Sequence, residues 1–176
     1  VEKYFEKTTP FERVAEDGIA IDQVGHKGDL KVEYNRKLFY PNVKSTMVSK
    51  DLFLKTRPDE MGSHTIKVFD SSRNSAGFSL GEKIKQIGGD LIIIHFAWSA
   101  SLLRGAVSVT CLQEMADYYN CSVKSLFTSN EAGHWKISVK ELNNTAKAHN
   151  RVNYFDISVS DHHQLHELRK DFSLPS

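Results

Sequence analysis

The chain has 176 residues, of which 40% are hydrophobic and 26% charged, and its 23 lysines and arginines nearly balance 22 acidic residues. This composition excludes a disordered chain, and a formal net charge of +1 gives no global attraction to a polyanion. The length predicts one β-rich domain over residues 1–176, with residues 1–17 as an N-terminal arm or helix and residues 160–173 as a C-terminal helix.

Short strands separated by polar turns are predicted through the first half of the chain. Between Leu30 and Tyr40 apolar and polar residues alternate, which is typical of a half-buried strand. The apolar residues of 78–87 have helical spacing, and the glycines at 88 and 89 would end a short helix there. The strands expected in this half cover residues 18–24, 30–40, 43–48, 52–54 and 64–70.

The most apolar stretch, Gly89–Leu112, is predicted to form the centre of the sheet. It opens with the apolar run Leu91–Ile94, and small or polar residues then alternate with Phe96 and Trp98. A second apolar segment follows at 106–112. Both segments are rich in β-branched residues and bounded by glycine, so they predict two strands. Apolar residues on both faces predict that the pair is covered on both sides.

The second half of the chain continues the same pattern. Residues 113–120 are expected to form one or two helical turns, and residues 143–150 a polar connection. Ser160 is expected to cap the C-terminal helix. Strands are predicted over residues 121–128, 134–139 and 152–159. The predicted fold is therefore mainly β, an antiparallel β-sandwich or jelly-roll-like arrangement with one or two short helices and a C-terminal helix, and with no internal repeat.

Two cysteines, Cys111 and Cys121, are too few for a disulfide framework. They predict an intracellular location, cytoplasmic and reducing, with Cys111 as a small core residue. No stretch reaches the roughly 18 apolar residues that a membrane span requires, so no transmembrane segment is expected. Residues 1–9 carry charge, unlike a signal peptide.

The densest group of chemically active side chains surrounds His162 and His166. In a helix these two imidazoles project from one face and could bind one Zn²⁺ or Ni²⁺. A third ligand is suggested only by residue type, and the polar outer face of a helix explains the pattern as well. An acidic residue two positions before Lys31 also resembles part of a nuclease site. A metal-dependent, nuclease-like enzyme is therefore one alternative, but no catalytic residue and no cofactor are predicted, and the pattern favours a protein that is not an enzyme.

A second pattern mixes cations with aromatic residues in one quarter of the chain. Bases stack on aromatic rings and phosphates pair with cations, so this mixture is typical of a surface for single-stranded nucleic acid. The charged outer faces of ordinary strands would look similar. The predicted nucleic-acid-binding residues are Lys31, Tyr34, Arg36, Lys37, Tyr40, Lys44, Lys50 and Arg57.

The order of segments in the second half resembles that of a known family. The segments that carry the likeness are Leu91–Phe96, Leu102–Gly105, Ala106–Val109, Cys121–Thr128 and His134–Val139. Their order, over roughly Gly89–Val159, resembles the jelly-roll-like core of plant-virus cell-to-cell movement proteins, and it also fits a viral matrix or capsid-like protein. The resemblance implies a viral protein that binds single-stranded nucleic acid.

The function predicted from the sequence is therefore non-enzymatic binding and assembly, with single-stranded nucleic acid as the expected partner. The alternative is a self-assembling structural protein or protein-interaction module without a role in nucleic-acid binding. In that case residues 43–54 are the candidate edge for self-association, because an exposed strand edge can pair with another chain.

Overall fold

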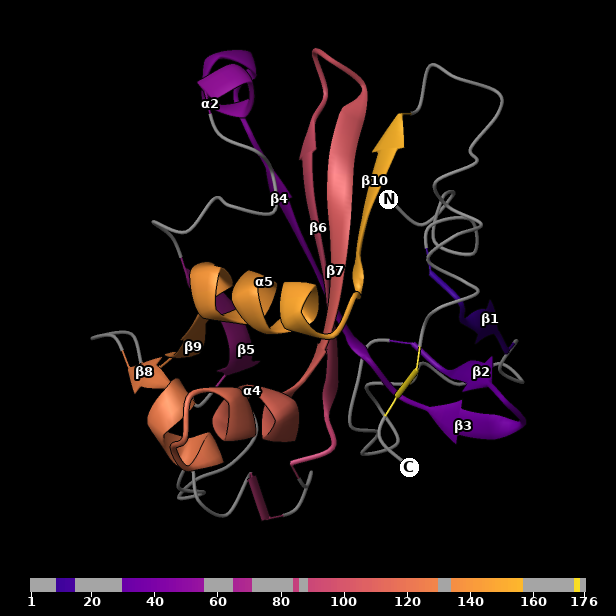
Figure 1. The fold of residues 1–176 in the computed structure, drawn as a ribbon, viewed down its shortest axis with the longest axis vertical. Coiled ribbons are helices and arrows are strands. Elements are labelled where there is room, and N and C mark those ends of the chain that lie inside the picture. The colour runs from indigo at the N-terminus through magenta and orange to yellow at the C-terminus, as the bar shows by residue number, and fades with distance from the viewer. Residues whose placement is uncertain are drawn as a thin grey trace.

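The structure, a computed structural model, describes residues 9–14, 30–55, 65–70, 84–85, 89–129, 134–156 and 173–174 and is mainly β (Figure 1). Sheet A has the order β1 (Glu12–Arg13), β2 (Val32–Tyr34), β3 (Lys37–Phe39). Sheet B has the order β10 (Val152–Asp156), β7 (Arg104–Cys111), β6 (Ile92–Ser99), β4 (Asn42–Met47). Sheet C has the order β5 (Thr65–Asp70), β9 (His134–Ser138), β8 (Thr128–Ser129). The helices are α2 (Lys50–Lys55), α4 (Leu112–Tyr118), the 3₁₀ helix η4 (Val123–Leu126) and α5 (Val139–Ala148).

The predicted central pair is confirmed as β6 and β7, which pair antiparallel from Ile92–Cys111 to Ser99–Arg104. The alternation of residues predicted from the sequence places successive side chains of β6 on opposite faces of the sheet. Ile94 and Phe96 belong to one buried cluster and Ile93 to the other. Apolar side chains on both faces of one strand require cover on both sides, and sheet B has it.

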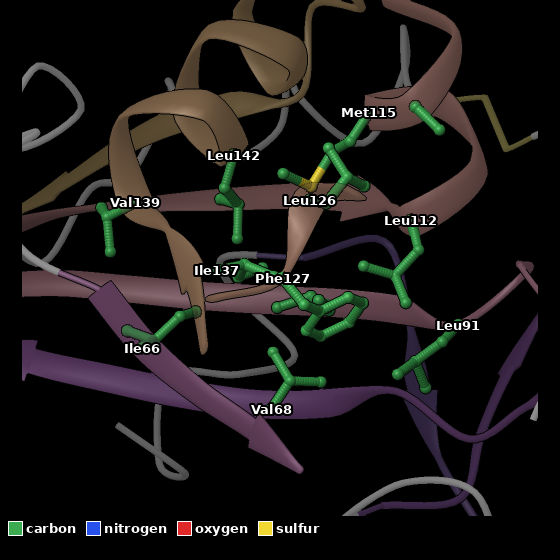
Figure 2. Close-up of a cluster of buried hydrophobic side chains, with 12 residues drawn as sticks. Ile66, Val68, Leu91, Leu112, Met115, Leu126, Phe127, Ile137, Val139 and Leu142 are labelled. Atoms are coloured by element: carbon green, nitrogen blue, oxygen red, sulfur yellow. The ribbon is translucent and has the colours of Figure 1, made fainter. Parts of the chain in front are cut away.

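One face of sheet B is covered by α4, α5 and sheet C, and the other by sheet A (Figure 1). On the first face, Leu91 packs with side chains such as Met115, Ile137 and Leu142 (Figure 2). On the second face, Phe11 and Val32 of the sheet A layer pack against the aromatic face of β6. Phe96 and Phe155 meet there edge to face, with ring centroids 6.3 Å apart.

The prediction of a purely antiparallel fold is wrong at β4. This strand pairs parallel to β6, from Asn42–Ile93 to Met47–Trp98, so sheet B is mixed. Side-chain alternation is the same in parallel and antiparallel strands, so the sequence pattern carries no direction. Among the described strands, β4 forms one edge of sheet B and β10 the other.

Several local predictions are corrected by side-chain caps and turns. Residues 52–54, expected as a strand, lie in α2, where the Ser49 hydroxyl accepts a hydrogen bond from the Leu52 N–H at 3.3 Å. Most of residues 143–150, expected as a polar connection, lie in α5. The segment expected as strand 121–128 contains η4, because Ser122 caps a 3₁₀ turn. The strand expected over 30–40 is a hairpin, since Asn35 and Arg36 have φ of 50° and 62°.

The helices α4 and α5 end in the same way, although the sequence pattern predicts no repeat. Asn120 and Asn150 both have positive φ, at 50° and 55°. The next residue of each, Cys121 or Arg151, donates its N–H to the carbonyl of an alanine five residues earlier, at 2.9 and 2.8 Å. This is the Schellman arrangement, in which asparagine tolerates the left-handed backbone. The matched residues are Leu112, Ala116 and Asn120 in and just after α4, and Leu142, Ala146 and Asn150 in and just after α5.

Some sequence predictions fall outside the described residues. These are the strand at 18–24, most of the helix at 78–87 and the C-terminal helix from Ser160. Of the N-terminal arm, residues 9–14 are described, and they contain β1. Every helix of the described part is too short or too polar to cross a bilayer.

Candidate nucleic-acid interface

The structure brings four of the predicted nucleic-acid-binding residues together on the β2–β3 hairpin. Arg36 lies in its turn, and Lys37 opens β3 opposite Tyr34. Lys31 lies one residue before the Val32–Phe39 pair, at the base of the hairpin. Arg36 and Lys37 are exposed, whereas Lys31 and Tyr34 are half-buried. Left-handed φ at both turn residues gives the two-residue turn that closes the hairpin and projects Arg36 outward.

Tyr34 has a packing role as well as a surface position. Its ring meets Phe11 edge to face, with centroids 5.9 Å apart, and it contacts the buried cluster of sheet A and β6. Phe39 meets the same Phe11 ring at 6.4 Å. Tyr34 therefore presents only part of its ring to a base.

The remaining predicted residues follow β4 away from the hairpin. Tyr40 lies between β3 and β4, Lys44 on β4 beside His95, and Lys50 at the start of α2. Tyr40 and Lys44 are half-buried and Lys50 is exposed. Six residues of β4 at about 3.3 Å each separate the hairpin from α2 by roughly 17 Å or more. The residues thus form a line rather than a cluster, and Arg57 lies outside the described residues.

We call this line the basic edge, because it follows the edge strand of sheet B. Residues 30–55 are all described and contain six cations against two acidic residues, Glu33 and Asp51. The charge is therefore concentrated here, although the whole chain carries only +1. The cations of the basic edge are Lys31, Arg36, Lys37, Lys44, Lys50 and Lys55.

An acidic hollow of about 290 Å³ lies beside the hairpin and limits where a phosphate could bind. Pro10, Glu12, Glu33, Tyr34 and Asn35 line it, and the β1–β2 register puts the two glutamates directly opposite each other. Facing carboxylates repel each other and also repel phosphate. A nucleic acid on the hairpin would therefore run along the β3 side and not over β1.

A row of buried polar side chains crosses sheet B, and the sequence analysis did not single it out. His95 lies opposite Ser108 of β7, and its Nε2 atom is 2.9 Å from the Thr46 Oγ1 atom. The Thr110 hydroxyl donates to the Leu142 carbonyl at 3.1 Å. His95, Ser108 and Thr110 are each at most 2% exposed, so this row does not reach solvent. It joins sheet B to α5 rather than presenting a reactive surface.

The proposed metal ligands His162 and His166 lie outside the described residues. Across the described ranges, no group of three or more histidine, cysteine, aspartate or glutamate residues could hold a metal ion. The metal site therefore stays a prediction from the sequence.

No protein-family model, no curated protein and no solved structure matches this chain.

Proposed function

We propose that the protein binds single-stranded nucleic acid along the basic edge, without catalysing a reaction on it. The observation that carries the proposal is the excess of six cations over two acidic residues along residues 30–55, which form the β2–β3 hairpin, the edge strand β4 and α2. A positive line with partly exposed aromatic rings suits a flexible strand, because phosphates can follow the cations while single bases stack on the rings. Tyr34 and Tyr40 are two of the half-exposed aromatic residues on this line.

The geometry also indicates how specific such binding would be. Cations that contact phosphates and rings that stack partly on bases make no hydrogen bonds to the base edges. Such binding therefore gives affinity with little sequence preference. The viral, jelly-roll-like identity suggested by the order of strands belongs to the same proposal. So does the reducing, intracellular location, which the exposed and unpaired thiol of Cys121 supports.

The experiment is fluorescence anisotropy with labelled single-stranded RNA of mixed sequence at about 50 and about 200 mM salt. We expect affinity to fall steeply with salt. The variant Arg36→Gln/Lys37→Gln should bind several-fold more weakly and should lower the log–log salt slope by about 1.4, at about 0.7 per lost phosphate contact on a single strand. A duplex of the same sequence should bind more weakly.

The matched control is Lys124→Gln/Lys140→Gln, which removes the same charge from exposed positions on η4 and α5. This control should leave affinity within twofold of the parent. Absence of RNA binding at low salt would reject the proposal. Equal loss in the two double variants would reject the basic edge as the site, since the attraction would then come from total charge.

The second candidate function is assembly through β4, favoured by its position at one edge of sheet B among the strands that the structure describes. A strand at the edge of a sheet can pair with a strand of another chain. Light scattering across a hundredfold concentration range tests this alternative, and a mass that stays monomeric would reject it.

A further inference from the structure

Four exposed apolar side chains gather at one end of sheet B. Six large hydrophobic residues are exposed in the described part of the chain, and four of them lie on α2, the end of β4 or the β6–β7 turn. These four are Met47 at 69% exposure, Leu54 at 67%, Leu52 at 46% and Leu103 at 43%. We call this group the apolar tip.

The elements that carry the apolar tip lie at the same end of sheet B. Met47 pairs with Trp98 in the β4–β6 register, and the Val48 N–H donates to the Trp98 carbonyl at 2.7 Å. The turn that holds Leu103 follows directly after β6, and α2 begins just after β4. Figure 1 shows α2 and this turn at the same end of the long axis of the molecule. The elements that carry the four residues therefore lie at the same end of the molecule.

Leu103 has a backbone conformation that a leucine adopts only at a cost. Its φ is 53°, in the left-handed region that is sterically disfavoured for a residue with a Cβ. A hairpin turn with such a residue ordinarily carries asparagine or glycine, which avoids that cost. The Leu103 side chain is 43% exposed, so part of its apolar surface is open to a partner.

The charges around the apolar tip identify the kind of partner. Lys50 and Lys55 flank the two leucines of α2 and are exposed, whereas Arg104, which follows Leu103, is paired with Asp156 at 3.0 Å. Asp51 is the acidic residue within α2. Apolar side chains flanked by two exposed lysines match the boundary of an anionic bilayer, where the acyl region accepts leucine and the headgroups attract lysine.

The size of the apolar tip argues against a second protein as its partner. Four partly exposed side chains present roughly a few hundred Å², whereas a stable protein interface needs about 800 Å² from each partner. A bilayer requires no complementary shape, so a small exposed group can bind it. Nucleic acid does not fit either, because leucine and methionine offer no ring on which a base can stack.

We infer that the apolar tip inserts shallowly into membranes that contain anionic phospholipid, with Lys50 and Lys55 at the headgroups. The contact is peripheral: α2 has six residues and lies on the surface. This inference does not rest on RNA binding, although the tip adjoins the end of the basic edge. Membrane binding would place the hairpin end of the basic edge away from the bilayer.

The test is co-sedimentation of the protein with vesicles of phosphatidylcholine alone or mixed with phosphatidylserine. We expect binding to the mixed vesicles only. Leu52→Gln/Leu54→Gln should weaken binding by about tenfold or more. Lys50→Gln/Lys55→Gln should weaken it by about fivefold for each lysine, from roughly 1 kcal/mol per charge near an anionic surface.

The control variant is Leu38→Gln/Tyr118→Gln, which changes the two other exposed hydrophobic residues of the described part, at 50% and 51% exposure. It should bind vesicles like the parent. Trp98, half-buried beside Met47, provides a direct probe. The chain has two tryptophans, so in a Trp135→Phe background the fluorescence of Trp98 should be quenched by brominated phosphatidylcholine in the mixed vesicles.

Three outcomes would overturn the inference. One is no binding of the parent protein to mixed vesicles. Another is equal loss of binding in the tip and control variants. The third is concentration-dependent association that Leu52→Gln/Leu54→Gln abolishes without any vesicle binding, which would make the tip a contact between copies. The tip variant should still bind RNA as the parent does, so failure of this inference is separate from failure of the proposed function.

Discussion

Removing the carboxylate of Glu114 should destabilise the protein strongly, because this carboxylate pairs with the buried guanidinium of Arg151. Arg151 follows α5 and Glu114 lies in the first turn of α4. The Arg151 Nη2 atom donates to Glu114 Oε1 at 2.8 Å and Nη1 donates to Oε2, so the pair is bidentate. The side chains are 3% and 13% exposed. Glutamine at 114 keeps one acceptor but removes the charge.

The size of the effect follows from this burial. Breaking a buried ion pair by removing one partner costs about 3–5 kcal/mol, which is a large share of a typical total stability of about 5–15 kcal/mol. With a urea m-value of about 2 kcal/mol/M, the unfolding midpoint of Glu114→Gln should fall by about 1.5–2.5 M.

Urea unfolding followed by circular dichroism gives the measurement, and two further variants sharpen it. Asp156→Asn breaks the more exposed pair with Arg104, whose side chains are 25% and 62% exposed, and should cost less than about 1 kcal/mol. Glu114→Leu/Arg151→Met replaces the whole buried pair by apolar groups and should be more stable than Glu114→Gln. If Glu114→Gln costs no more than Asp156→Asn, the reasoning from burial is refuted.

Two further predictions concern the packing of β7. A Cβ on Gly105 would lie 2.5 Å from the Ala97 carbonyl oxygen, so Gly105→Ala should lower the free energy of unfolding by about 1–3 kcal/mol. At Gly89 the closest atom is the end of the flexible Gln113 side chain, so Gly89→Ala should change the free energy of unfolding by less than about 0.5 kcal/mol. Equal effects of the two substitutions would contradict the prediction. Burial raises the pKa of the Cys111 thiol, so at pH 8 Ellman's reagent should titrate one thiol quickly, the exposed Cys121, and none in Cys121→Ser. Because the folded pKa lies above the unfolded one, the contribution of Cys111 to stability is present below the unfolded pKa and is lost as the pH rises through the folded pKa.

The centre of the fold could be predicted from the sequence because its signals are physical and dense. Leu91–Ile94 is the longest apolar run in the chain, and covered strands in the middle of a sheet need such residues. The alternation from His95 to Ser99 fixed which side chains share a face, and the structure has that division. The residues of a strand do not encode which strand it pairs with or in which direction, so the sequence did not predict that β4 pairs parallel to β6.

The helix α5 was missed although its start carries a recognisable signal. Ser138 and Glu141 form an S-x-x-E sequence, and the Ser138 hydroxyl accepts a hydrogen bond from the Glu141 N–H at 3.3 Å. The asparagines at 143 and 144 suggested a connection, yet Asn143 is 1% exposed. For the candidate site, the composition of the sequence predicted a basic segment. It did not predict that this segment lies partly on a hairpin and partly on the edge of a sheet, because that arrangement depends on the tertiary fold.

The parallel pairing of β4 with β6 has a consequence for the order in which the chain folds. The β6–β7 hairpin closes through a short turn, whereas β4 reaches β6 only after residues 48–91 have been looped out. Contacts distant in sequence pay a larger closure entropy, so we expect β4 to dock late, onto a sheet that already exists. The middle of the basic edge and the first residue of the apolar tip lie on this strand. A partner that holds β4 in place would stabilise the folded state by mass action, so the last step of folding and the first step of binding would involve the same six residues.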